Sequence, residues 1–279
     1  MSAALSDLLR VPSGPVDLAA IDTRSTPGFT GNKAAGQQAL AALAAPISEL
    51  QERLFAHGRT GGTRRLLLVV QGMDTSGKGG TMRHAVGLMD PQGVRIKAFG
   101  APTAEEQRRG FLWRIRQALP GPGVVGVFDR SHYEDVIAVP VRRLAQAGTI
   151  EKRYDEINQF EAELVESGCE LIKVMLHISR EEQKARLMAR LDDPSRHWKY
   201  NPGDIDDRVL WDDFQRAYEL ALQRCNSDAA PWHVVPADRK WYRNWAVTRL
   251  LVDRLRSMDL AWPNAEFDVE KERERLAAT

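Results

Sequence analysis

Short continuous apolar segments alternate along this chain with longer segments of helical periodicity. The apolar segments, at 66–70, 94–99, 124–128, 171–178 and 233–235, are the strand candidates. Most are apolar at every position, which is typical of strands in a parallel sheet that is covered on both faces. Their alternation with helical segments predicts an α/β fold, with a five-stranded parallel sheet as the middle layer of a three-layer sandwich.

Capping and stop signals indicate where the helices lie. A helix over about 78–89 follows the first strand, the capping-box pattern at 103–106 opens one that Pro120 stops, and a similar pattern at 179–182 opens one toward Leu191. Two further helices are indicated by apolar residues recurring on one face, namely Ile150, Tyr154, Ile157 and Leu164 in the first and Ile205, Val209, Phe214, Ala217 and Ala221 in the second.

The two ends of the chain differ from the middle. Residues 1–60 are rich in Pro, Gly and Thr to about 31 and in Ala and Leu to about 56, so we expect an extended arm and one packing helix. Residues 61–262 carry all five strand candidates and form the main domain. The charged run near 270–275 predicts a solvated helix in a C-terminal helical tail over 263–279.

Composition restricts the class of protein. The chain of 279 residues is 43% hydrophobic with a mean hydropathy of −0.40, which suffices for a full core. Its 39 Lys and Arg against 38 Asp and Glu argue against a general nucleic-acid or membrane surface, so a polyanion would need a local groove. Two cysteines without metal-ligand spacing and no apolar stretch of spanning length lead us to expect a cytoplasmic protein.

The first strand runs into a glycine-rich turn, LLLVVQGMDTSGKGGT at 66–81. Gly72, Gly77 and Lys78 have the Walker A spacing, in which backbone N–H groups and a helix N-terminus surround a phosphate and the lysine adds a cation. The alternative is a turn whose glycines only supply positive φ. The strand before it and the helix after it favour a phosphate site. The remaining predicted phosphate-binding positions of this loop are Thr75, Ser76, Gly79 and Gly80.

Two departures from the usual Walker A loop indicate how a metal is held. Gly79 stands where a Ser or Thr hydroxyl usually binds Mg²⁺, and the carboxylate of Asp74 lies within the loop. A carboxylate among phosphates is tolerated only if a cation separates them. We therefore expect Asp74 to hold the metal.

The third strand ends in a second motif, VVGVFDRSHYEDV at 124–136. An acid after an apolar strand is the Walker B pattern, so Asp129 is expected beside the P-loop, sharing a metal ion with Asp74. Arg130 is able to neutralise phosphoryl charge, although a surface ion pair is the alternative. Glu134 is either a helix N-terminal acid or a group near the metal, and His132 is expected to be a hydrogen-bonding neighbour.

A third charged segment, at 185–208, interrupts two helices with Pro and Gly. Such a segment after the fourth strand is typical of a lid that closes over phosphates, and we place this helical lid at about 190–210. Arg190, Lys199 and Arg208 are its candidate phosphate contacts. The alternative is a solvated loop with internal salt bridges.

Several separated motifs, in order, resemble the polyphosphate kinase 2 family. They are GMDTSGKGGT, KAFGAPTAEEQRRGFLWR, FDRSHYEDV, RHWKYNPGDIDDRVLWDDF and PWHVVPADRKWYRNW, and together they cover about residues 30–260. The resemblance implies a P-loop kinase-like fold and reversible phosphoryl transfer between inorganic polyphosphate and a nucleotide. The single-domain subclass that accepts both AMP and ADP is the most similar, although Gly79 and Gly80 depart from its pattern.

The same resemblance assigns roles to individual residues. It implies that Asp74, Lys78, Asp129 and Arg130 handle metal and phosphate, that Arg190 reaches the transferred phosphate, and that Glu134 influences nucleotide choice. Lys199 and Arg208 are carried over as lid or polyphosphate contacts. It further implies Mg²⁺ with Mn²⁺ as an alternative, adenine or guanine nucleotides as partners, no nucleic acid or membrane, and a homo-oligomer, dimeric or tetrameric.

Two other classes of function remain to be compared. An ATP-dependent nucleoside monophosphate kinase shares the sheet, loop and lid but ordinarily keeps a hydroxyl after the lysine, so Gly79 and Asp74 count against it. A non-catalytic P-loop protein has little use for lid arginines. In-line transfer requires no protein nucleophile, and we predict no essential histidine.

Overall fold

The computed structural model describes residues 3–279. Its core is one five-stranded sheet in the order β2-β3-β1-β4-β5, and every neighbouring pair is parallel. The strands are β1 Arg65–Gln71, β2 Val94–Ala98, β3 Val125–Asp129, β4 Cys169–His177 and β5 Trp232–Pro236. The sequence-based prediction of five parallel strands is confirmed, and each candidate segment overlaps one strand.

The chain order places helices between successive strands. Before β1 lie α1 Leu5–Leu9, η1 Leu18–Ala20, α2 Lys33–Ala41 and α3 Ala44–Arg59. Between β1 and β4 lie α4 Lys78–His84, η2 Val86–Leu88, η3 Pro91–Gly93, α5 Ala104–Gln107, α6 Trp113–Ala118, η4 His132–Asp135, α7 Ala138–Val141 and α8 Ala147–Glu166. After β4 lie α9 Arg180–Leu191, η5 Pro194–Lys199, α10 Gly203–Val209, α11 Trp211–Arg224, α12 Lys240–Ser257 and α13 Val269–Ala277.

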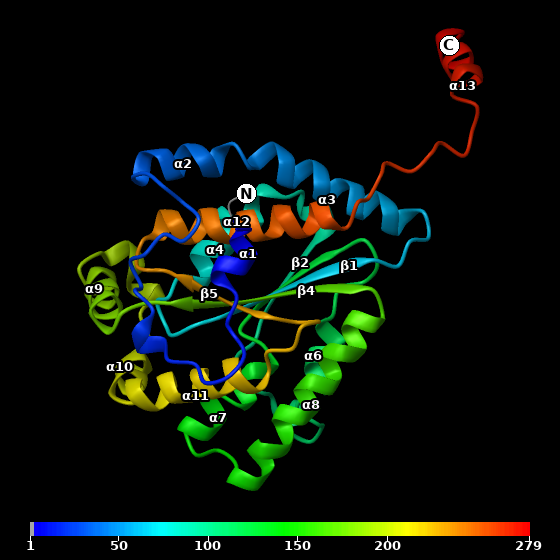
Figure 1. Cartoon of the computed structure of the whole chain (residues 1–279). Helices are drawn as coiled ribbons and strands as arrows, with labels where there is room; N and C mark the ends of the chain where they lie inside the picture. Colours follow the sequence, from blue (N-terminus) through cyan, green and yellow to red (C-terminus); the bar gives the residue numbers. More distant parts are fainter. Residues whose placement is uncertain (1–2) are drawn as a thin grey trace.

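Helices cover both faces of the sheet, as Figure 1 shows. One face carries α4 and α12, with α2 and α3 packed outside α12, and the other carries α6, α8 and α11. The central strand β1 is almost entirely inaccessible to solvent along its length, whereas the edge strand β2 is mostly exposed. Because β1 lies between β3 and β4, the loops after these three strands meet at one edge of the sheet.

The N-terminal arm is part of the main core. Leu5, Leu9 and Leu18 belong to the same buried cluster as the sheet. The stretch predicted as one packing helix is two, α2 and α3, separated at 42–43. Gly36 allows the close approach of α2 to α12, because a Cβ at this position would lie 2.1 Å from the Trp241 ring.

Three predicted helices differ from those observed. The helix expected over 103–120 is two short ones, since Gly110 interrupts it, although the capping box of Thr103 is present in full. The helix expected over 78–89 ends at His84 and continues as a 3₁₀ turn. The helical face expected over 205–221 breaks between α10 and α11, so Ile205 and Val209 are exposed instead of buried.

The C-terminal tail ends in the helix α13, which stands away from the rest of the molecule in Figure 1. None of its residues is buried, so the predicted solvated helix is confirmed. The limits set for the arm, the main domain and the lid remain predictions.

Candidate functional site

The P-loop lies between the end of β1 and the start of α4. Gly77 has φ 110° and Thr75 has φ 63°, both in the left-handed region, so the loop turns sharply twice. Thr75, Gly77, Gly79 and Gly80 line one cavity with Lys78. Ser76 is fully buried, and its N–H donates to the carbonyl of Met73 over 3.0 Å.

Asp74 of the P-loop is held by two cations. Arg130 donates to its Oδ1 over 2.9 Å, and the ammonium of Lys78 lies 4.0 Å from the same oxygen. Burial alone raises the pKa of Asp74, but the charges of Lys78 and Arg130 outweigh this effect and hold the pKa below its ordinary value. Lys78 also donates to the carbonyl of Gly72 over 2.7 Å. Asp74 is therefore ionised at neutral pH.

Asp129 ends β3 opposite Val70 of β1, where the Walker B pattern predicts it. The chain then turns back over β1, since the N–H of Arg130 donates to the carbonyl of Val70 over 3.1 Å and Arg130 has φ 63°. Asp129 and Asp74 line the same cavity. The structure thus brings the two predicted metal ligands and Arg130 to one place.

The pair of carboxylates fits a Mg²⁺ ion. Magnesium prefers oxygen ligands and is usually bound through one or two carboxylates with substrate phosphates and water. Among residues 3–279 no group of three or more His, Cys, Asp or Glu side chains has the arrangement of a metal site. Asp74 and Asp129 would therefore hold the ion together with phosphate oxygens.

A cavity of about 890 Å³ lies over the P-loop and is strongly basic. Three carboxylates line it, those of Asp74, Asp129 and Glu182. Eight lysine or arginine side chains line it, namely Lys78, Arg83, Arg186, Arg190, Arg196, Lys199, Lys240 and Arg243. This excess of cations in one cavity, on a chain with almost no net charge, is the local groove that a polyanion requires.

The predicted lid residues divide between two places. Arg190 and Lys199 line the basic cavity, and Arg190 donates to the carbonyl of Lys199 over 2.8 Å and lies 3.3 Å from Asp204. Arg208 does not line it. Its guanidinium donates to the carbonyl of Arg180 over 2.6 Å and to Gln183 over 3.1 Å, on the side of α9.

A second cleft adjoins the basic cavity at Asp74. It has a volume of about 410 Å³ and is lined by Asp74, Arg130, Arg142, Asn201, Gly203, Asp204, Asp206, Asp207 and Leu210. A narrow continuation contains Gly72 and Glu134. Gln71 donates to Glu134 over 3.2 Å, and burial raises the pKa of Glu134 although Arg130 opposes the rise. Asp74 and Arg130 thus stand at the junction of two sites with different charge.

Comparisons with known proteins agree with this geometry. Residues 30–262 match the family described as Polyphosphate kinase 2 (PPK2). The chain belongs to this family. The chain is 42% identical to an AMP/ADP-polyphosphate phosphotransferase from Meiothermus ruber, over 93% of this chain and 96% of the other. It is 34% identical to an ADP-polyphosphate phosphotransferase from Rhodopseudomonas palustris, over 89% and 88%.

A solved structure supports the fold of this polyphosphate kinase 2 family member. The crystal structure of Polyphosphate Kinase 2 from Arthrobacter aurescens TC1 superposes with a TM-score of 0.97 at 53% sequence identity, covering 99% of this chain and 98% of the other. The P-loop kinase-like α/β fold that the motifs imply is therefore confirmed.

Sequence reasoning missed Arg243 in the site of this family member. Arg243 is only 3% exposed, and the hydrogen bonds of its guanidinium go to Asn244 and to the carbonyl of Ser76, not to a carboxylate. It donates to Asn244 Oδ1 over 2.7 Å, and burial followed by the charge of Arg186 lowers its pKa to about 10. A buried cation without an acid is costly unless an anion approaches it. The basic residues after the fifth strand, in DRKWYRNW, were the available signal.

His132 lies behind the site, not in it. It is fully buried, and its Nε2 donates to Glu161 over 3.2 Å. Glu161 also accepts from Lys173 over 2.6 Å and from Tyr133 over 2.7 Å. This buried network anchors η4, the turn that carries Glu134.

Among residues 3–279, none of the helices is long and apolar enough to cross a membrane.

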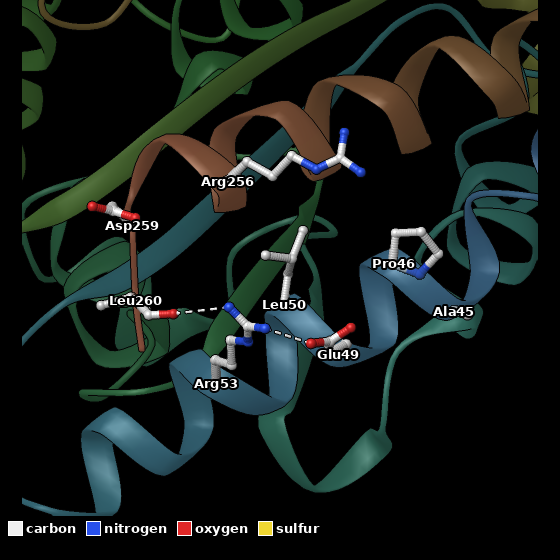
Figure 2. Close-up of a pocket in the computed structure, with 8 residues that line it drawn as sticks. All are labelled: Ala45, Pro46, Glu49, Leu50, Arg53, Arg256, Asp259 and Leu260. Atoms are coloured by element: carbon white, nitrogen blue, oxygen red, sulfur yellow. Dashed lines mark hydrogen bonds and ion pairs between the residues drawn. The ribbon is translucent and has the colours of Figure 1, made fainter. Parts of the chain in front are cut away.

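A separate cavity of about 500 Å³ lies between α3 and the end of α12, as Figure 2 shows. Arg53 donates there to the carbonyl of Leu260 over 3.4 Å and to Glu49 over 2.5 Å. No residue of this cavity lines the P-loop cavity or the second cleft. It is therefore not part of the candidate site.

Proposed function

We propose that this chain transfers a phosphoryl group reversibly between inorganic polyphosphate and ADP or AMP. The observation that carries the proposal is the basic cavity over the P-loop, which meets at Asp74 a cleft lined by two arginines and four aspartates. A long polyanion needs many cations along its path, whereas a mononucleotide needs few. The eight cations of the cavity suit polyphosphate, and the two guanidinium groups of the cleft suit the phosphate end of a nucleotide.

The charges indicate which substrate each site takes. Polyphosphate lies over the P-loop, among the eight lysine and arginine side chains. The nucleotide lies in the second cleft with its terminal phosphate at Arg130. Asp206, an exposed carboxylate of this cleft, can accept hydrogen bonds from ribose hydroxyls or from an exocyclic amino group, which suits adenine, with guanine as an alternative.

In the forward direction an oxygen of the nucleotide's terminal phosphate attacks the terminal phosphorus of polyphosphate. The new P–O bond forms as the bond to the bridging oxygen breaks, and polyphosphate one unit shorter leaves. Lys78, Arg130 and Arg190 stabilise the charge that spreads over the transferred group. When bound at Asp74 and Asp129, Mg²⁺, or Mn²⁺ as an alternative, neutralises charge on the phosphates.

No side chain has to act as nucleophile or strong base, because the attacking phosphate oxygen is already anionic near neutral pH. The buried position of His132 supports this. Lys199 contributes a further polyphosphate contact. Arg208 supports the P-loop and does not contact polyphosphate directly. It donates to Gln183, and Gln183 in turn donates to the carbonyl of Asp74 over 3.2 Å.

The test is incubation with long-chain polyphosphate, Mg²⁺ and either ADP or AMP, without ATP, followed by chromatography of the nucleotides. We expect ATP from both acceptors. ATP from ADP alone would show that AMP is not an acceptor. No product from either nucleotide would contradict the proposed function. Conversion of AMP by ATP alone would favour the ATP-dependent monophosphate kinase. We further propose a cytoplasmic homo-oligomer, and light scattering tests whether it is a dimer or tetramer.

A further inference from the structure

Two guanidinium groups line the second cleft, those of Arg130 and Arg142. Both also line its narrow continuation, so they lie near one another. Arg130 is held at Asp74, where the two sites meet, and it serves the reacting phosphate. Arg142 follows α7 and has no part in the mechanism given above. A second cation in an otherwise acidic cleft requires an explanation.

Asp207 of α10 holds Arg142 in a fixed orientation. Its Oδ2 accepts from Nη2 over 2.5 Å and its Oδ1 from Nε over 3.2 Å. The Asp207 side chain is 12% exposed, whereas that of Arg142 is 46% exposed. The bidentate contact therefore uses one edge of the guanidinium and leaves the other accessible from the cleft. Such an arrangement presents a phosphate-binding group at little further entropic cost.

We propose that Arg142 binds the α-phosphate of ADP and is the residue that distinguishes a nucleoside diphosphate from a monophosphate acceptor. The proposal rests on the proposed function, because it takes the nucleotide as the acceptor. The terminal phosphate of either acceptor lies at Arg130. Only ADP has a second phosphate to reach Arg142, so AMP gains nothing from this side chain. Asp207 acts as a positioning residue through Arg142.

Three variants test the proposal by steady-state kinetics with ADP, AMP and polyphosphate varied separately. Arg142→Gln removes the charge but keeps a polar side chain. We expect the KM for ADP to rise roughly 10- to 100-fold, the range that loss of a charged hydrogen bond gives. The KM values for AMP and polyphosphate should change less than about threefold. Arg143→Gln is the matched control, because Arg143 is exposed and does not line the cleft.

Asp207→Asn separates phosphate binding from a structural role of the ion pair. It removes the group that orients Arg142, so the KM for ADP should rise, by less than in Arg142→Gln, while the KM values for AMP and polyphosphate change less than about threefold. If Arg142 only fastened α7 to α10, Asp207→Asn and Arg142→Gln would raise all three KM values alike, and this result would overturn the proposal. An equal rise for AMP and ADP in Arg142→Gln would overturn it too. Thermal unfolding checks that each variant is folded.

Calorimetric binding of ADP and of AMP, without polyphosphate, distinguishes failure of this proposal from failure of the proposed function. Absence of ATP synthesis by the wild-type chain would refute the function. An ADP affinity that falls in Arg142→Gln while the AMP affinity does not would still support the role of Arg142. Equal ADP affinity in the wild-type chain and in Arg142→Gln would refute it.

Discussion

The Arg130 guanidinium donates a hydrogen bond to the Asp74 carboxylate over 2.9 Å, and this contact joins the end of β3 to the P-loop. Both residues line the basic cavity or the adjoining cleft, and Asp74 lines both. The carboxylate that departs from the usual Walker A pattern is thus balanced by a cation of the Walker B segment. Its Oδ1 takes the contacts with Arg130 and Lys78, which keep the carboxylate in place beside Asp129.

Replacing either predicted metal ligand should abolish most of the activity without unfolding the chain. We expect Asp74→Asn and Asp129→Asn each to cost several kcal/mol of transition-state stabilisation, about 100-fold or more in kcat/KM. The measurement is ATP synthesis over a Mg²⁺ titration, with unfolding curves alongside. Asp228→Asn, at an exposed surface pair with Arg10, serves as control. Near-wild-type activity of either variant at limiting Mg²⁺ would contradict the shared metal.

The parts of the fold that depend on local pattern could be predicted from the sequence. Continuous apolar segments identified all five strands, and the spacing of Gly77 and Lys78 identified the loop. The sequence did not show that the buried face predicted over 205–221 is interrupted. The chain breaks at Leu210 between α10 and α11, and Val209 of α10 is exposed. Arg208, predicted as a lid or polyphosphate contact, belongs to α10 and does not line the basic cavity.

Residues that join the site through tertiary packing could not be placed from one sequence. Arg243 comes from α12, and its contact with the P-loop depends on how that helix lies over the sheet. Arg142 lies at the second cleft beside Asp207 of α10, which is 65 residues away in the sequence. Neither residue stands at a strand end, where sequence reasoning looked for function.

Two glycines of the P-loop should differ sharply in their tolerance of a methyl group. A Cβ at Gly77 would lie 1.7 Å from Arg243 Nη1, and Gly77 has φ 110°. A Cβ at Gly79 would meet no atom within 4 Å. Gly77→Ala should therefore lose about 1–3 kcal/mol of unfolding free energy or more.

The matched variant Gly79→Ala should stay within about 0.5 kcal/mol of the wild-type chain, because its methyl group is unopposed. Urea unfolding curves of the two variants provide the comparison. Equal stability of the two would mean that the P-loop does not pack against Arg243 as described. Activity is not the readout, since both glycines line the phosphate cavity.

Removing one partner of the buried ion pair between Lys173 and Glu161 should strongly destabilise the folded chain. Both side chains are at most 2% exposed, and their atoms lie 2.6 Å apart. Lys173→Met leaves an uncompensated carboxylate in the core, so we expect a loss of about 3–5 kcal/mol. The double variant Lys173→Met with Glu161→Gln should lose less than the sum of the single changes.

Urea unfolding of the single and double variants measures this coupling. Glu272→Gln, which breaks a surface pair on α13, is the control and should change stability by less than about 1 kcal/mol. A loss of stability in Lys173→Met as small as that in Glu272→Gln would show that the buried network does not hold η4 in place.

Stability should fall in mild acid because of His233. Burial lowers the pKa of this imidazole from 6.5 to about 4, although its Nδ1 donates to the carbonyl of Lys173 over 3.2 Å. Between these values the unfolded chain takes up a proton that the folded chain does not. The contribution of neutral His233 to the free energy of unfolding is therefore fully present above pH 6.5 and is lost as the pH falls toward 4. The loss amounts to up to about 3 kcal/mol.

His233→Gln should flatten this dependence, as measured by urea unfolding at several values across that pH window. The slope of stability against pH is the readout, because the substitution itself changes the absolute stability of a buried position. Burial also lowers the pKa of His177, so the variant should retain part of the slope. A slope identical to that of the wild-type chain would show that folding does not lower the pKa of His233.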